Sequence, residues 1–120
     1  MRYLFLLHSP DGGPPTDPDD PAVRKMYEEY GAAVTAMAEA GVLVDCAPLT
    51  PAASATTLRV RDGEVLLTDG PAAELKEQVG GYTIVECGDL DEALRWAATM
   101  PAARDSVVEV RAVIDTGRAH

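Results

Sequence analysis

Four ionisable side chains stand at the ends of predicted strands or within them, and these are the candidates for acid–base chemistry. His8 follows the apolar run Tyr3–Leu7, and a histidine there could act as a general base because its pKa lies near neutrality. Asp45 and Glu86 interrupt two other apolar runs, where burial would raise the pKa of a carboxyl group. Asp69 begins a turn at the end of a further strand. We take His8, Asp45 and Asp69 as candidate catalytic residues.

Each of these side chains also has a structural interpretation. His8 could be a surface or hydrogen-bonded histidine without a chemical role. Asp45 and Glu86 could face water at a sheet edge or pair with an arginine. Asp69 precedes Gly70-Pro71, and an aspartate at such a turn accepts hydrogen bonds from nearby backbone N–H groups.

Tyr30, Tyr82 and Glu86 are the candidate ligand contacts for a small molecule. Tyr30 lies on the apolar stripe of a predicted helix, so it is first of all a core residue whose hydroxyl finds a wet edge. No Ser-His-Asp order, phosphate loop or metal-ligand spacing is visible in the sequence, so nucleophilic hydrolysis and nucleotide chemistry have no support. Cys46 and Cys87 form no CxxC pair. We therefore expect free thiols in a reducing cytoplasm, no metal site and no cofactor.

The strands that must position these residues follow from the apolar runs. The least interrupted runs, at 3–7 and 82–87, predict central strands that are buried on both faces. Residues 42–49 predict an edge strand because Pro48 lies near its end. Apolar and charged residues alternate over 106–114, which is typical of an edge or half-exposed strand.

Two helices separate these strands. Asp20-Pro21 predicts the start of the first helix, and Gly41 its end. Asp89, followed by a glutamate three residues later, predicts the start of the second helix, and Pro101 is expected to stop it. A long loop, either mobile or a lid, is expected between 8 and 20.

A β-hairpin is predicted over 57–68, because Asp62-Gly63 between two extended runs is a strong two-residue turn signal. After the turn at 69–71, the chain is expected to form a short helical segment that breaks at Gly80-Gly81. With this hairpin as an insertion, the order strand, helix, strand, strand, helix, strand predicts an α+β fold of the ferredoxin-like, split βαβ kind. We expect a single domain over 1–120, with a loose tail at 115–120.

The stretch 68–82 resembles the signature of the YCII-related (DGPF) family. The matching positions are Thr68, Asp69, Gly70, Pro71, Glu74, Lys76, Glu77, Gln78, Gly80, Gly81 and Tyr82. Further matches lie at 55–63, 89–93 and 108–111. Ala72 and Leu75 depart from the phenylalanine and threonine that are usual there, and Ala72 removes an aromatic anchor from the turn.

The resemblance implies a fold, an assembly and a possible partner. The family is similar to dimeric α/β-barrel proteins, in which two sheets pack face to face, so a homodimer is expected. Two helices cover only one face of the predicted sheet, and a second copy would cover the other. Relatives occur beside, or fused to, extracytoplasmic-function sigma factors, which implies a regulatory role. A His–Asp pair proposed for some members has no match here, because its helical histidine falls near Tyr30.

The composition excludes several classes of partner. The net charge is −10, with 20 acidic and 10 basic residues, and such a field repels nucleic acids and anionic membranes. The first apolar run is too short for a signal peptide, and no run is long enough to cross a bilayer. Two hypotheses remain: a cofactor-free acid–base enzyme acting on a small organic molecule, or a non-catalytic ligand-binding or regulatory module.

Overall fold

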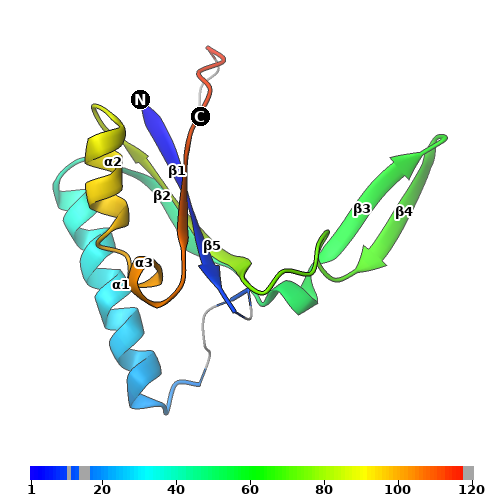
Figure 1. The fold of residues 1–120 in the computed structure, drawn as a ribbon, viewed down its shortest axis with the longest axis horizontal. Coiled ribbons are helices and arrows are strands. Elements are labelled where there is room, and N and C mark those ends of the chain that lie inside the picture. Colours follow the sequence, from blue (N-terminus) through cyan, green and yellow to red (C-terminus); the bar gives the residue numbers. More distant parts are fainter. Residues whose placement is uncertain (11, 14–16, 118–120) are drawn as a thin grey trace.

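Two apolar strands form the centre of an antiparallel sheet in the computed structural model, which describes residues 1–10, 12–13 and 17–117. They are β1 (Arg2–Ser9) and β5 (Gln78–Glu86), flanked by β2 (Leu43–Pro48) and β6 (Val108–Ala112) in the order β2-β5-β1-β6 (Figure 1). The predicted central and edge strands are thus confirmed. The chain is α+β with antiparallel sheets, and its topology is compatible with a ferredoxin-like fold.

Alternation along the central strands separates a covered face of the sheet from an open one. Tyr3 and Phe5 on β1 pair with Val85 and Thr83 on β5, and all four side chains are buried. Leu6 and its neighbours of the same parity point to the other face and are only half-buried. The prediction of burial on both faces therefore holds for one face of the isolated chain.

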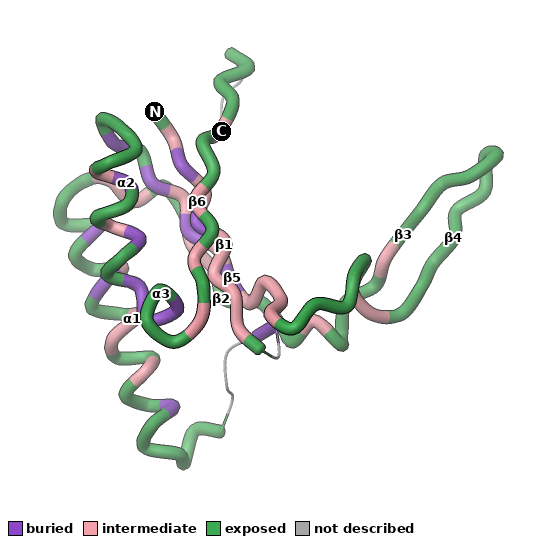
Figure 2. The backbone as a smooth tube through the Cα atoms, in the orientation of Figure 1, coloured by how far each residue is buried: buried purple, intermediate pink, exposed green. Residues whose placement is uncertain are grey.

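The helices α1 (Pro21–Glu39), α2 (Leu90–Ala97) and α3 (Pro101–Asp105) all lie on the covered face (Figures 1 and 2). The Asp20 side chain caps α1 by accepting a hydrogen bond from Ala22 N at 2.9 Å. The Asp89 side chain likewise caps α2, through Glu92 N at 2.9 Å. The helices and sheet enclose one core of Tyr3, Phe5, Ala33, Met37, Val85, Cys87, Ala93, Ala97 and Met100.

Two predictions about helices are wrong. Pro101 does not stop the second helix: α2 ends at Ala97, and Pro101 is the first residue of α3, a position that suits proline because its missing N–H has no partner there anyway. No helix forms between Asp69 and Gly80. Residues 71–77 are irregular and β5 already begins at Gln78.

Gly80 lies inside β5, and the close packing of residues 9 and 13 against it explains why this position is a glycine. A Cβ atom added to Gly80 would lie 2.9 Å from Gly13 N and 3.1 Å from Ser9 Oγ. Ser9 Oγ itself donates to Gly13 O and accepts from Gly13 N at 3.1 and 3.0 Å. The glycine therefore serves close packing between β5 and residues 12–13 rather than helix termination.

The predicted hairpin forms a separate two-stranded sheet of β3 (Thr56–Arg61) and β4 (Glu64–Asp69). Its turn residues Asp62 and Gly63 have φ angles of 52° and 78°, as a two-residue turn of this type requires. The hairpin follows the short 3₁₀ helix Ala52–Ser54 and projects on the side of the sheet away from the helices (Figure 1).

The loop expected between 8 and 20 and the tail expected at 115–120 lie in part outside the described residues. Within the described residues, β1 continues through Ser9, past the predicted end of the strand. No helix among the described residues combines the length and the apolarity needed to cross a membrane.

Candidate functional site

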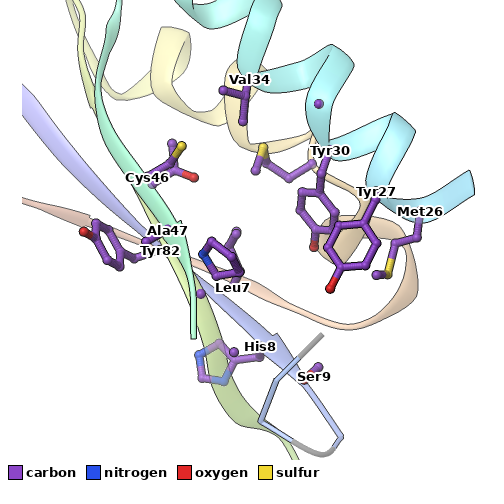
Figure 3. Close-up of a pocket in the computed structure, with 16 residues that line it drawn as sticks. Leu7, His8, Ser9, Met26, Tyr27, Tyr30, Val34, Cys46, Ala47 and Tyr82 are labelled. Carbon is purple, nitrogen blue, oxygen red and sulfur yellow. The ribbon is translucent and has the colours of Figure 1, made fainter. Parts of the chain in front are cut away.

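A pocket of about 350 Å³ lies between α1 and the covered face of the sheet (Figure 3). Its volume falls near the lower end of the range of about 300–1,000 Å³ that is typical of small-molecule sites. Its walls consist of Leu7, His8, Ser9, Met26, Tyr27, Tyr30, Gly31, Val34, Cys46, Ala47, Pro48, Gly80, Gly81, Tyr82, Thr83 and Met100. Most of these residues are apolar, so the pocket favours an apolar ligand.

The α1 wall of the pocket comes from residues three and four apart on one helix face, among them Met26, Tyr30 and Val34. The hydroxyl of Tyr30 accepts a hydrogen bond from the buried Ala102 N at 3.1 Å. Burial raises the pKa of Tyr30 above its ordinary value of 10.0, so the phenol stays neutral near pH 7. Tyr30 therefore contributes both a ring and a neutral hydroxyl to the wall.

The sheet wall carries two small polar groups in neighbouring strands. Cys46 on β2 pairs with Thr83 on β5, and both residues line the pocket. Thr83 is only 1% exposed, and its Oγ1 has no hydrogen-bond partner within the described part of the chain. A buried hydroxyl without a partner is costly. Because Thr83 Oγ1 is itself buried, a ligand group that bonds to it needs a small shift of the sheet wall and would then relieve that cost.

Gly31 leaves part of the α1 wall open. A Cβ atom added there would meet nothing within 4 Å, although glycine in a helix interior costs roughly 0.5–1 kcal/mol relative to alanine. Gly31 therefore lowers the stability of the helix at a position that lines the pocket.

His8 lies at the edge of the pocket, beside Ser9 (Figure 3). Its Nε2 is 3.6 Å from Glu109 Oε1, too far for a hydrogen bond but close enough for attraction when the imidazole is protonated. Glu109 pairs with Leu6, so it points to the open face of the sheet. The His8 side chain thus faces Glu109 rather than the apolar interior of the pocket.

Asp45 and Tyr82 come together outside the pocket interior. The Tyr82 hydroxyl donates to Asp45 Oδ2 at 2.9 Å, and this hydrogen bond raises the pKa of Tyr82 above 10.0. Figure 3 shows the Tyr82 ring on the far side of the sheet from Tyr30. Asp45 is exposed, so the expected burial of its carboxylate is not found.

Glu86 and Asp69 also lie away from the pocket walls. Glu86 is exposed, again contrary to the expected burial, and its Oε2 lies 3.3 Å from Arg2 Nε. Asp69 ends β4 and pairs with Thr56 at the base of the hairpin. Of the six candidates, His8, Tyr30 and Tyr82 belong to the pocket lining, although the Tyr82 ring lies on the far side of the sheet, and the three carboxylates do not.

Sequence reasoning missed Cys46, Thr83 and Gly31 as pocket residues. Thr83 had a signal, because it is a hydroxyl at an inward position of an apolar strand. Cys46 was interpreted only as a free thiol, and both cysteines are indeed unpaired. Gly31 had the signal of a glycine in the middle of a helical stripe. Among the described residues, no group of three or more His, Cys, Asp or Glu side chains could hold a metal ion.

The fold and pocket define a small α+β protein with one apolar site beneath its long helix. Comparison with known families gives a match to the YCII-related domain over residues 1–116. The chain belongs to the YCII-related domain family, as the stretch 68–82 predicted. It is also 46% identical, over 68 residues, to an uncharacterised protein of Rhizobium meliloti (strain 1021), a match that covers 57% of this chain and 55% of that protein. The matched region thus spans only about half of that relative.

Proposed function

We propose that this protein binds a small, mainly apolar organic molecule in the pocket between α1 and the sheet. The observation that carries the proposal is the pocket of about 350 Å³ with apolar walls and a buried hydroxyl at Thr83 that finds no hydrogen-bond partner in the described part of the chain. Few but well-placed polar groups in an apolar cavity are typical of sites that orient a small ligand. The Tyr30 and Thr83 hydroxyls and the Cys46 thiol supply those groups.

Thiol modification tests this proposal even while the natural ligand is unidentified. We expect at least one compound from a panel of small aromatic and aliphatic carbonyl compounds to slow the reaction of Cys46 with a thiol reagent. Cys87 is the internal control, because it is buried in the core and does not line the pocket. Burial raises the pKa of Cys87, so it reacts slowly in any case. A panel that never protects Cys46, or slows both thiols equally, contradicts the proposal.

Cofactor-free acid–base catalysis is the second candidate function, and it is favoured by His8 with Glu109 beside it at the pocket edge. If its imidazole turned from Glu109 towards the pocket, His8 would remove a proton from a carbon next to a carbonyl group. We expect the protein to speed deuterium exchange into a panel compound that it binds, and the His8→Gln variant to bind it without exchange. Binding with no exchange in the unmodified protein would leave a ligand-binding role alone.

The regulatory alternative is a complex with an extracytoplasmic-function sigma factor. What favours a non-catalytic role is that Asp45, Asp69 and Glu86 lie outside the pocket, so that no carboxylate of the described residues lines it. A pull-down of a neighbouring sigma factor that persists in the His8→Gln variant would support this role, and no retention would count against it. The two free cysteines favour a reducing compartment, and we propose the cytoplasm.

We also propose a ferredoxin-like fold that pairs as a dimeric α/β barrel, with a second copy on the open face of the sheet. Leu4, Leu6 and Ile84 lie on this face and are half-buried in the single chain. A stable interface needs about 800 Å² from each partner. The family resemblance supports the same arrangement.

A further inference from the structure

One face of the hairpin of β3 and β4 is aliphatic and exposed along its outer part, beyond the Thr56–Asp69 pair at its base. Leu58 pairs with Leu67, and Val60 with Val65, so these four side chains share one face, here called the apolar arm face. Their exposed fractions are 58%, 65%, 54% and 60% in that order. The opposite face carries Thr57, Arg59, Arg61, Glu64, Leu66 and Thr68.

This hairpin lacks support from the rest of the chain. Among the described elements, β3 and β4 pack chiefly on each other. The radius of gyration is 16.0 Å, whereas a compact domain of this length would have about 13.6 Å. A solitary two-stranded hairpin is marginally stable in water, so an arm of this kind needs a surface that covers its apolar face.

We propose that the apolar arm face packs against a second copy of this chain, so that each protomer holds its partner with one arm. This inference rests on the homodimer proposed above. The hairpin projects on the side of the sheet that the helices leave open (Figure 1). A second copy seated on the open sheet face therefore lies within reach of the arm, and the twofold relation gives it an equivalent arm in return.

The area needed for a stable dimer supports this choice of occupant. The four aliphatic side chains offer on the order of 400 Å² of apolar surface, which is about half of the roughly 800 Å² per partner that a stable interface buries. The sheet face offers less for each residue, because Leu4, Leu6 and Ile84 are already half-buried. The open sheet face adds to the area that the arm supplies.

Charge also bears on the partner. With a net charge of −10 per chain, two copies repel each other at long range, so their association must come from apolar contact. An anionic membrane would be repelled in the same way. The four side chains of the apolar arm face are uncharged, and Asp69 lies at the base of the same face, so the outer part of the arm is suited to an aliphatic surface on an equally acidic partner.

Sedimentation equilibrium of the full chain tests the arm, with adjacent residues as a matched pair. Leu67→Asp places a charge on the apolar arm face, and Thr68→Asp places the same charge one residue away on the opposite face. We expect Leu67→Asp to raise the dimer dissociation constant at least tenfold and Thr68→Asp to change it less than threefold. Far-UV circular dichroism should match the unmodified protein in both variants, because neither residue belongs to the core.

The outcomes separate the arm from the dimer itself. If the unmodified protein sediments as a monomer at low micromolar concentration, both the homodimer and the arm are overturned. This also holds if the hairpin of the monomer binds a different protein. The arm alone is overturned if Leu6→Asp dissociates the dimer while Leu67→Asp and Thr68→Asp change its dissociation constant equally. Selective weakening by Leu67→Asp supports the arm.

Discussion

Thr83 and Tyr30 show how single polar groups give an apolar pocket its chemistry. The Tyr30 hydroxyl already has a partner in Ala102 N, at 3.1 Å, whereas Thr83 Oγ1 has none within the described residues. A ligand group that reached the buried Thr83 Oγ1 would therefore relieve an unpaired hydroxyl there. At this scale the sequence identified Tyr30 correctly as a residue of the helical stripe.

The carboxylates were harder to place from the sequence. Asp45 and Glu86 were expected to be buried because each interrupts an apolar run. The parity of the strands decides otherwise: Phe5, Thr83 and Val85 face the helices, and Glu86 follows on the opposite face. An apolar run does not reveal which of its two faces the helices cover, and this explains the error.

Tyr30 makes stability depend on pH in the alkaline range. Burial raises the pKa of Tyr30 in the folded chain, so the unfolded chain loses this proton at a lower pH. The free energy of unfolding should be unaffected near neutrality and should fall as the pH rises above about 10. Tyr30→Phe should show a smaller fall in urea-unfolding series at rising pH. Equal falls in both proteins would contradict the assignment.

Among the predicted helices and turns, the confirmed features are those whose physical cause lies within a few residues. The caps Asp20 and Asp89 and the turn Asp62-Gly63 depend only on local hydrogen bonds and backbone angles, and all three were predicted. The short helix expected before Gly80 does not form, because tertiary packing decides the conformation of this stretch. Gly80 is required by the close approach of Gly13, which no local pattern shows.

Gly31 offers a prediction about α1. Because a Cβ atom there meets nothing within 4 Å, Gly31→Ala should raise the free energy of unfolding by about 0.5–1 kcal/mol. Gly63→Ala is the control: its φ of 78° is unfavourable for alanine, so it should lower stability by about 1 kcal/mol. Urea unfolding measures both changes. A loss of stability in Gly31→Ala would mean that the helix wall is not open at this position.

For the whole molecule, the order of the strands was predictable and the assembly stays a prediction. The apolar runs identified β1 and β5 as central, and the proline and the alternating charges identified β2 and β6 as edges. The hairpin was also predicted, but not its projection away from the sheet. The partner proposed for its aliphatic face lies beyond the single chain, and a pattern within one chain does not specify such a contact.

Adjacent residues on β1 should separate folding from assembly. Phe5 is fully buried under the helices, so Phe5→Asp would bury an unpaired charge at a cost of several kcal/mol and unfold the protein. Leu6 points to the open face, so Leu6→Asp should give a folded monomer. Circular dichroism and sedimentation measure the two effects. A Leu6→Asp variant that stays dimeric would contradict the proposed sheet interface.

Two-dimensional ¹H–¹⁵N NMR with the same panel of carbonyl compounds would show whether the pocket binds a small molecule. The matched variant is Gly31→Leu, whose side chain should fill the open part of the α1 wall without disturbing the core. At least one compound should shift the amide signals of Cys46 and Thr83 in the unmodified protein and leave them unchanged in Gly31→Leu. If no compound shifts them, or if the same shifts persist in the filled variant, the pocket is not the binding site.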